Sequence, residues 1–536
     1  MPVKYKIFFS LIISISLLKV DAQINITSKS PSADSVKIIQ IIQAASLRQI
    51  TINDSTIFET LSGKAIVKQG NTTLSGDSII LNKRLGTVEV FGNVHINDAD
   101  TVNTFAQYLK YLGKEQIAYL YNKVKFSDGK ALLFTDQLEY NIKTGIAQYK
   151  NGGKVINEKT TLTSKNAVYY SDTKDAIFQH QVHLTDPKYD MTADSLRYNT
   201  AFKNAYFISP THIKSKNGTI DTKSGTYNLQ TGEALFFEKT IFRDQTKFIS
   251  GNKIAIDEKN NIIQIEDNGK FIDSLNKIIV IGNQILIDNK KNTFLATRKP
   301  VMIFYRDNDS TYIAADTLFS GKKFLPKNNA VNDTMKKQIE NNKSISVDSI
   351  QYFLGFHHVR IFNDSIQAVC DSLHYSTEDS TFKLFQHPIC WNGSTQISGD
   401  TMYLLTENQK AKKIKIYFNS IVVNKTKEGL FNQNSGKTMN VFFKDEKIDY
   451  IITKGNPTES IFYTQDDDSA YIGMNKCSGD EQYILFEAGK VAKIKYSNEV
   501  NGTLYPFNQI PISIKFLKNF SWQDDKRPKN KVEIFE

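Results

Sequence analysis

The sequence has few cysteines, only three in 536 residues. Three cysteines are too few for a disulfide scaffold of the kind that stabilises small secreted domains. Cys370 and Cys390 could form one bond in an oxidising compartment, or both could stay as buried thiols, and the sequence leaves the two alternatives open. The fold must therefore rest on packing and backbone hydrogen bonds.

Long apolar runs are missing after the first 22 residues. Lys4 and Lys6 form a basic start, Ile7 to Leu18 is apolar, and small residues precede Gln23. This order is typical of a secretory signal peptide. The apolar stretch is shorter than the roughly 20 residues that a membrane-spanning helix needs. No cysteine follows it, so a lipoprotein anchor is not indicated. We expect residues 1–22 to be a signal peptide.

Dense basic stretches are also missing. Lys and Arg number 67 and Asp and Glu 56, a net charge of +11. Residues 1–22 hold three lysines and one aspartate, a net of +2, which leaves +9 for the rest (11 − 2). This excess suits an anionic partner. Because no basic helix or stripe accompanies it, we expect no nucleic acid partner.

Catalytic motifs are absent. The sequence has no nucleophile elbow, zincin helix, phosphate-binding loop or dinucleotide fingerprint. Ser380 and Lys383 match Ser-x-x-Lys, but no partner motif accompanies them. The histidine pairs 180/183 and 357/358 lack a third ligand at metal-binding spacing. We therefore expect no enzyme, no catalytic residue, no metal site and no cofactor.

A short repeat dominates what is present. It reads Asp-x-apolar-x-apolar, as in Asp194-Ser195-Leu196-Arg197-Tyr198. Clear copies start at Asp77, Asp136, Asp371 and Asp400, and weaker ones at Gln107, Asn166, Lys223, Asn252, Asn283, Asp316 and Asp348. The anchors 77, 107, 136, 166, 194, 223, 252, 283 and 316 are 30, 29, 30, 28, 29, 29, 31 and 33 residues apart. So regular a period is the signature of a repeat architecture.

Each repeat of about 29 residues has the composition of short strands and turns. β-branched and aromatic runs alternate with Asn, Gly and Pro, which predicts an all-β protein with three short strands per unit. One unit cannot bury its apolar side alone, so the units must stack. We expect the apolar positions to line a common interior: Ile79, Leu81, Leu109, Leu138, Tyr140, Val168, Leu196 and Tyr198. These large side chains either fill the interior or line a groove for a ligand.

The anchor aspartates are interpreted as turn residues. Asp and Asn side chains hydrogen-bond their own backbone two residues on and so stabilise tight turns, and Asn replaces Asp in several copies. The structural positions are Asp77, Asp136, Asp194, Asp371 and Asp400. A calcium-binding ladder would need Gly-rich turns with closely spaced Asp, and the sequence has none.

The repeat rhythm breaks once, in an Asn- and Lys-rich stretch. We expect residues 23–320 to form a first repeat domain, 321–345 a loop or linker, and 346–536 a second repeat domain. About 14 units with one layer each would give a rod of about 65 Å, and three layers each a rod on the order of 200 Å.

Three blocks carry a resemblance to a known family. They are Leu61–Val67, Leu74–Ile79 and Val90–Ile96, which combine Gly-x-Val-like and Gly-Asp-x-apolar patterns. The array resembles the OstA/LptA-like organic-solvent-tolerance family, in particular the long OstA-like proteins of Bacteroidetes. The likeness is strongest over residues 50–320 and 346–420. The chain is about three times longer than the family's short bridge protein and lacks the large C-terminal membrane barrel of the translocon.

The resemblance implies a fold and a function. The fold is the β-jellyroll or β-taco, a solenoid of stacked short strands with an apolar trough. The implied function is lipopolysaccharide transport, with the acyl chains of lipid A shielded in the trough during export to the outer membrane. The implied place is the periplasm, with association with the outer membrane left open. The implied partners are lipopolysaccharide and other export proteins, or a second copy, joined by edge-strand addition.

Two alternative functions belong to other classes of protein. A filled β-solenoid would serve as a structural or adhesion protein. A β-helix enzyme acting on polysaccharide would need a polar cleft with clustered acids on its outer face.

Overall fold

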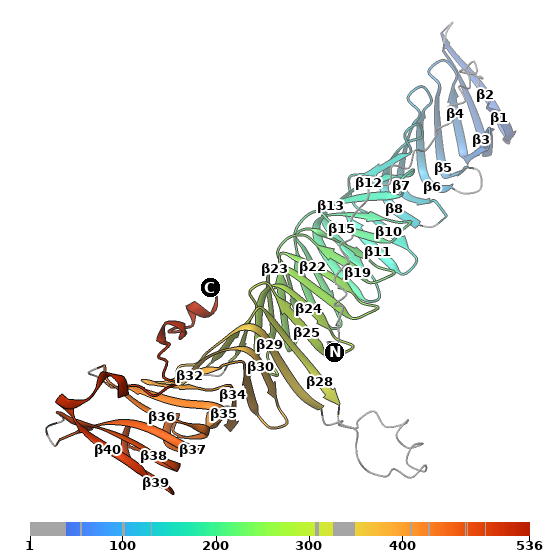
Figure 1. The fold of residues 1–536 in the computed structure, drawn as a ribbon. Coiled ribbons are helices and arrows are strands. Elements are labelled where there is room, and N and C mark those ends of the chain that lie inside the picture. Colours follow the sequence, from blue (N-terminus) through green and yellow to red (C-terminus); the bar gives the residue numbers. More distant parts are fainter. Residues whose placement is uncertain are drawn as a thin grey trace, which may run out of the picture.

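The computed structural model describes residues 39–53, 56–98, 102–129, 131–305, 310–324, 349–407, 410–426, 429–466, 468, 470–487 and 489–536. The expected signal peptide lies outside these residues. Within them the chain forms antiparallel strands stacked into one long body, which runs from β1–β3 at one end to β39 and β40 at the other (Figure 1). The predicted fold class, an all-β repeat stack, is confirmed.

The strands follow one another with short turns. The first group is β1 (Gln40–Gln43), β2 (Ser46–Asn53), β3 (Thr56–Gln69), β4 (Thr72–Asn82), β5 (Thr87–Asp98), β6 (Val102–Leu112), β7 (Ile117–Ser127), β8 (Ala131–Asn141), β9 (Ile146–Tyr149), β10 (Gly153–Asn157), β11 (Thr160–Ser164), β12 (Asn166–Tyr170), β13 (Asp175–Thr185) and β14 (Tyr189–Asn199). The middle group is β15 (Asn204–Phe207), β16 (Thr211–Ser215), β17 (Gly218–Thr222), β18 (Gly225–Asn228), β19 (Glu233–Phe236), β20 (Thr240–Arg243), β21 (Lys247–Gly251), β22 (Lys253–Asp257), β23 (Ile262–Asp273), β24 (Ile278–Asp288), β25 (Thr293–Thr297), β26 (Val301–Phe304), β27 (Thr311–Ala314) and β28 (Thr317–Phe324). The last group is β29 (Ser349–Phe362), β30 (Gln367–Ser376), β31 (Thr381–Phe385), β32 (Ile389–Asn392), β33 (Thr395–Ser398), β34 (Thr401–Glu407), β35 (Lys410–Lys425), β36 (Phe431–Lys444), β37 (Lys447–Gln465), β38 (Tyr471–Glu487), β39 (Lys490–Ser497) and β40 (Asn501–Pro506).

Many strands bend at their middle. In β7, Asn122 and Lys123 have φ of 61° and 54°, and the pairing of β7 with β8 shifts register at this point. Two consecutive residues in the left-handed region turn the strand sharply while its two halves keep their neighbours. The bends lie above one another along the stack. They divide every layer into two halves and so produce two sheets that face each other.

We call these sheet 1 and sheet 2. Sheet 1 contains half-strands such as 78–82 and 87–91, and sheet 2 contains half-strands such as 72–75 and 95–98. The two sheets meet at the bends, which form the closed corner of the fold. At the opposite side their hairpin turns approach each other along a line that we call the seam.

One glycine shows how tight the corner is. Gly92 has φ of +67°, and a Cβ there would lie 2.2 Å from Oδ2 of Asp77. Glycine alone combines this backbone conformation with so close an approach.

The repeat unit differs from the predicted one. Along one period the chain makes two half-strands in sheet 1 and two in sheet 2. An example is the unit in which 196–199 pair with 204–207 in sheet 1 and 211–215 pair with 218–222 in sheet 2. The expected three strands per unit are therefore wrong. One unit adds two layers to each sheet, about 10 Å of length at ~4.8 Å per layer.

The core lies between the two sheets. A single cluster of buried apolar side chains runs from Leu61 to Phe486. Phe178 and Phe236 of this cluster are among the largest fully buried side chains of the described residues. The interior is thus one continuous apolar layer rather than a series of separate cores.

The stack continues across the expected linker. β28 pairs with β29 over eight residue pairs, from Thr317 with Phe356 to Phe324 with Ser349. The cluster of buried side chains also spans this point, through Leu318 and Phe353. Division into two domains at residues 321–345 stays a prediction, and backbone pairing crosses the proposed boundary.

Each end of the stack has one edge strand in each sheet. β1 and β2 both pair with β3, and β39 and β40 both pair with β38. At the first end the inward side chains of Ile41 and Leu47 are 45% and 59% exposed, because none of the described residues forms a further layer over them.

The C-terminal tail, residues 507–536, runs back over the outer face of sheet 2 (Figure 1). Its ordered turns are η1 (Phe507–Gln509), η2 (Ile512–Ile514), η3 (Asp524–Lys526) and η4 (Val532–Ile534). Leu517 packs against Ile461 and Met474, and Ile534 packs against Val301 and Phe362.

Buried glutamines of sheet 2 hold the tail. The side chain of Gln433 donates to the Lys515 carbonyl over 2.9 Å and accepts from the Leu517 N–H over 2.8 Å. Gln396 does the same with the Ser521 carbonyl, at 2.6 Å, and the Gln523 N–H, at 2.8 Å. Among the described residues, no helix is long and apolar enough to cross a membrane.

Candidate functional site: the apolar interior and its seam

The predicted inward residues lie mostly in the core. Ile79, Leu81, Leu109, Leu138, Leu196 and Tyr198 are buried, and Tyr140 is half-buried against the same cluster. Period-two alternation places them on one face of sheet 1.

Val168 is the exception. It is half-buried on the outer face, whereas its neighbours Ala167 and Tyr169 point into the interior. The anchor of this repeat is thus Lys165 rather than Asn166. The Lys165 N–H donates to the His180 carbonyl at a bend, just as the N–H of Asn252 donates to the Asp267 carbonyl. With 165 in place of 166, the steps from 107 to 194 become 29, 29 and 29.

The anchor aspartates lie at the closed corner, as expected, but they act differently. Their carboxylates contact residues at the bend of a neighbouring strand instead of their own backbone. Asp77 accepts from Asn93 Nδ2 over 3.0 and 3.1 Å, and Asp400 accepts from Asn419 Nδ2 over 2.9 Å. Asp194 lies 3.4 Å from His180 Nδ1 and Asp371 lies 3.1 Å from His357 Nδ1. Asp136 is exposed and faces the bend at 122–123.

In the turns at the seam, Asn side chains accept hydrogen bonds from the backbone of their own turn. This is the role that was expected of the anchor aspartates. Asn82 Oδ1 accepts from the Leu85 N–H, and Asn141 Oδ1 accepts from the Thr144 N–H, both over 3.0 Å. Such side-chain-to-backbone bonds stabilise tight turns.

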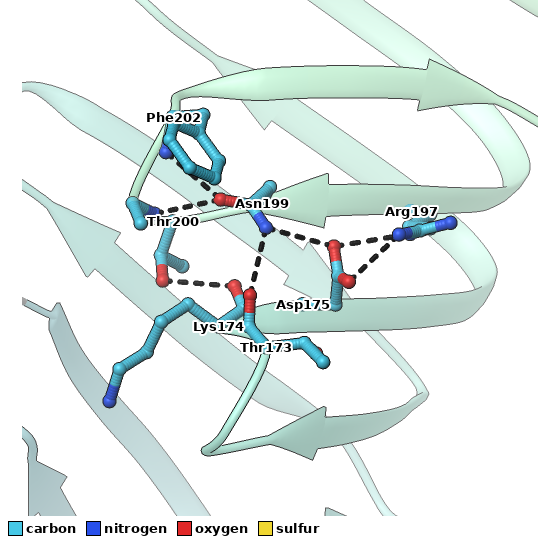
Figure 2. A network of polar contacts seen from close by, with 8 residues as sticks. Thr173, Lys174, Asp175, Arg197, Asn199, Thr200 and Phe202 are labelled. Carbon is cyan, nitrogen blue, oxygen red and sulfur yellow. Dashed lines mark hydrogen bonds and ion pairs between the residues drawn. The ribbon is translucent and has the colours of Figure 1, made fainter. Parts of the chain in front are cut away.

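Figure 2 shows how one such turn is joined to the next. Asn199 Oδ1 accepts from the N–H groups of Ala201 and Phe202, while its Nδ2 donates to Asp175 and to the Thr173 carbonyl. Arg197 donates to both oxygens of Asp175, over 2.8 and 3.1 Å. The hydrogen bonds from Arg197 are the main reason why the pKa of Asp175 is lowered.

A row of alternating tyrosine and alanine lines the interior next to the seam. Tyr111, Tyr140, Tyr169, Tyr198 and Tyr227 follow one another at one constant step, which is that of the repeat. The strand pairing places an alanine between each two of them: Ala118, Ala147, Ala176 and Ala205, with Ala234 beyond the last. We call this the Tyr–Ala row.

A small cavity lies beside this row. Its volume is about 40 Å³. Sheet 1 contributes Ala147, Tyr169 and Ala176, and sheet 2 contributes Leu133 and Val155 across the interior. Asp128 and Thr200 close it toward the seam. Elsewhere along the row the interior is filled by side chains of the core cluster.

Side chains bridge the seam above the cavity. Tyr169 Oη donates to Asp128 Oδ2 over 2.7 Å, and Asn157 Nδ2 donates to the Thr200 carbonyl over 3.3 Å. Lys203 Nζ lies 2.8 Å from Glu158 Oε2.

A further bridge lies nearer the middle of the chain. Tyr189 of sheet 2 and Tyr227 of sheet 1 both donate to Glu258 Oε1, and their rings pack edge to face at 4.9 Å. In all these bridges a side chain forms the link, whereas backbone hydrogen bonds run along each sheet.

The tyrosine hydroxyls stay protonated and able to donate. Burial raises the pKa of Tyr198 to about 12. Burial also raises the pKa of Tyr169, and the hydrogen bond to Asp128 adds to this effect. The pKa of Tyr227 is raised as well, mainly by burial and to a smaller extent by the hydrogen bond with Tyr189.

The two lips of the seam differ in charge. Turns of sheet 1 carry lysines, which we call the basic rim: Lys83, Lys114, Lys143, Lys174, Lys203, Lys259 and Lys290. Three of these turns also hold an acid, namely Glu115, Asp172 and Glu258, so that lysines outnumber acids on this side. Most turns of sheet 2 carry an acid beside their own lysines, and we call these acids the acidic rim: Asp98, Asp128, Glu158, Asp186, Asp244 and Asp273. The Lys203–Glu158 pair joins the two rims directly. The hydrogen bond from Lys203 is the main cause that lowers the pKa of Glu158.

Sequence reasoning missed most of this arrangement. Of the Tyr–Ala row the hydrophobic alternation of the sequence identified Tyr111, Tyr140 and Tyr198 as inward positions, and it identified neither the alanines nor the rims. The signal was available, because the tyrosines and the alanines each recur at the constant step of the repeat. The described cysteines are all free thiols, and Cys370 and Cys390 are buried.

The geometry defines an all-β stack with an apolar interior and a charged seam. Residues 37–194 match the model of one protein family, described as OstA-like protein. This part of the chain is an OstA-like domain, and the resemblance seen in the sequence is confirmed there. No curated protein matches the chain.

Proposed function

We propose that the protein binds lipopolysaccharide in the periplasm and shields the acyl chains of lipid A between its two sheets during export to the outer membrane. The observation that carries this proposal is the single apolar interior that extends from Leu61 to Phe486. The OstA-like match at one end supports a lipid-transport role for such an interior.

Burial of acyl chains supplies the free energy of binding. Each CH₂ group removed from water contributes about 0.8 kcal/mol. An interior that is continuous over many layers lets a chain move from one layer to the next without returning to water. The predicted contacts are the inward residues of sheet 1, such as Leu138 and Leu196, and they remain proposals.

The basic rim suits the rest of the ligand. Lysines such as Lys143 and Lys203 lie at the mouth of the apolar interior, where the phosphates of lipid A would remain in water. The chemistry of the site thus matches a ligand with acyl chains at one end and phosphates at the other.

The ends of the stack suit partner proteins with the same fold. β2 and β39 each have one edge without a neighbour in the described structure. Such an edge can pair with a strand of another export protein or of a second copy. This pairing would extend the apolar interior from one protein into the next.

Photo-crosslinking from the interior tests the proposal. A diazirine analogue of leucine at position 138 keeps the shape of a side chain that is 2% exposed. We expect it to crosslink to lipopolysaccharide in cells. The matched control is the same group at Gln137, the exposed neighbour on the same strand. Crosslinks from position 137 alone, or from neither, would contradict the proposal.

A filled structural rod is the second candidate. It is favoured by one observation, namely that buried side chains occupy the interior from Leu61 to Phe486 and that the cavity beside Tyr169 measures only about 40 Å³. A rod of this kind would give no lipid crosslink from position 138 and would still extend between its partners.

A further inference from the structure

The proposed function requires room that the closed structure does not offer. A cavity of about 40 Å³ is too small for an acyl chain. The two ends of the stack are one way in. The seam is another, and its construction differs from that of the rest of the protein.

We propose that the seam between residues 111 and 258 is a lateral entrance for a phosphorylated lipid, held shut by tyrosine–carboxylate hydrogen bonds. The alanines of the Tyr–Ala row would provide the spaces into which the acyl chains fit. This inference rests on the proposed function and adds the route of entry to it.

In the described part of the chain, side-chain bridges rather than backbone hydrogen bonds hold the seam. Both sheets keep their backbone hydrogen bonds when their lips separate, because these bonds run along each sheet. Opening breaks side-chain bridges such as Tyr169–Asp128 and Tyr189–Glu258. The corner opposite the seam provides the hinge line, since the chain passes through it from one sheet to the other, within one strand as in β7 and β13 or between two short strands as in β15 and β16.

Long and short side chains alternate along the Tyr–Ala row. Tyr169 reaches across the seam, whereas Ala147 and Ala176 on either side of it do not. The cavity lies against these two alanines. When a tyrosine ring turns outward, the space that it leaves joins the spaces over its neighbouring alanines, and a groove along the row results.

The two sides of the seam carry different charges, the basic rim on sheet 1 and the acidic rim on sheet 2. Glu158 occupies the position opposite Lys203 that an anionic headgroup would take. A lipid phosphate can replace this carboxylate, because Lys binds both as a point charge. The ligand would then supply the interactions that the open seam loses. The acidic rim would thus act as an internal substitute for the phosphates of the ligand.

A reversible bond across the seam tests the route. Asn157 and Thr200 are the partners of one bridge, with 3.3 Å between Nδ2 and the carbonyl oxygen. The variant carries Asn157→Cys and Thr200→Cys, with Cys370, Cys390 and Cys477 replaced by alanine and the diazirine at position 138. We expect oxidation to abolish the crosslink to lipopolysaccharide and a reductant to restore it.

The matched control places a disulfide within one sheet. Thr161 and Thr185 face each other on neighbouring strands of sheet 2. The Thr161→Cys, Thr185→Cys pair should leave the crosslink unchanged in both redox states. Equal crosslinking by the oxidised seam variant and its reduced form would overturn the lateral entrance and leave the proposed function intact. Absence of any crosslink, even in the reduced protein, would overturn both.

A second variant keeps the test valid if the cysteines disturb folding. Ala147→Phe fills the cavity from sheet 1, and Gln148→Phe adds the same ring on the opposite face of the same strand. We expect Ala147→Phe to lose the crosslink and Gln148→Phe to keep it, with the circular dichroism of both unchanged. Equal crosslinking by the two folded variants would contradict the role of the alanines.

Discussion

Asp175 links two neighbouring turns of sheet 1 through Arg197 and Asn199 (Figure 2). Its side chain is 13% exposed, whereas that of Arg197 is 43% exposed, so water screens the ion pair in part. Hydrogen bonds to a charged group contribute about 1.5–3 kcal/mol each at most. We expect Asp175→Asn to lower the free energy of unfolding at pH 7 by about 2 kcal/mol, as measured by urea denaturation.

The pH dependence of this difference has a definite sign. Because the pKa of Asp175 is lowered in the folded protein, its contribution is complete above the unfolded value of about 3.9. It is lost as the pH falls through the lower, folded pKa. The difference between the two proteins should therefore disappear in strong acid. A difference that persists there would show that the charge is not its cause.

Asp194→Asn provides the matched control. Asp194 lies on β14, the strand that also carries Arg197, but the side chain of Asp194 is 64% exposed. Exposed ion pairs contribute little, so this change should alter stability by less than about 0.5 kcal/mol.

Single residues of the interior could be predicted where hydrophobic alternation was clear. Leu138 and Leu196 have polar neighbours on both sides, so only one face can be apolar. In the stretch Asn166-Ala167-Val168-Tyr169-Tyr170 the sequence does not show which face is buried. Ala167 with Tyr169 and Val168 with Tyr170 are both apolar enough to point inward. The constant step of the repeat favours Ala167 and Tyr169. Alanine carries a weak hydrophobic signal, and the alanines of the row were missed for that reason.

At the scale of elements, the bend in each strand explains the miscounted unit. Residues such as Gly92-Asn93 have the composition of a hairpin turn, and in the structure they turn a strand without reversing it. Local sequence does not distinguish these two outcomes. The distinction depends on whether the residues beyond the bend pair with the same neighbour, which is a property of the stack.

The tail is the element whose attachment can be tested most directly. Gln396 is fully buried and contacts the tail at two backbone groups, on Ser521 and Gln523. Gln396→Leu keeps the approximate size of the side chain and removes both bonds. Loss of partners for such groups costs about 1–3 kcal/mol. We expect the backbone amide of Gln523 to exchange with deuterium about 10- to 100-fold faster than in the unchanged protein.

The control for this variant is Gln137→Leu, an exposed glutamine far from the tail. It should leave exchange at Gln523 unchanged. Unchanged exchange in Gln396→Leu itself would mean that apolar contacts such as those of Leu517 hold the tail without the glutamine. The path of the tail could not be predicted, because residues 507–536 lack a repeat pattern and contact strands far earlier in the chain.

At the scale of the whole molecule, the unit of two layers determines the length. The stack of strands in sheet 1 from β2 to β39 should extend on the order of 130 Å at ~4.8 Å per layer. This value lies between the two lengths derived from the sequence. Small-angle scattering should give a maximum dimension near this value. A radius of gyration of about 24 Å, the value expected for a compact protein of this size, would contradict it.

The sequence predicted the class of architecture because one period persists through many units. It did not predict whether the Asn- and Lys-rich stretch separates two bodies, since a long insertion between two paired strands has the same composition as a linker. The pairing of β28 with β29 is a contact that such a composition does not reveal.

The strict spacing of the Tyr–Ala row has a consequence for how such a chain can change. Each tyrosine from Tyr111 to Tyr227 occupies the same position near the end of a paired strand, so removal of one whole repeat would rejoin equivalent backbone positions. A gene could therefore lose or duplicate one unit while both edges, and any docking partners, stay as they were. The length of the stack would then change in increments of about 10 Å, one for each repeat gained or lost, without redesign of either end.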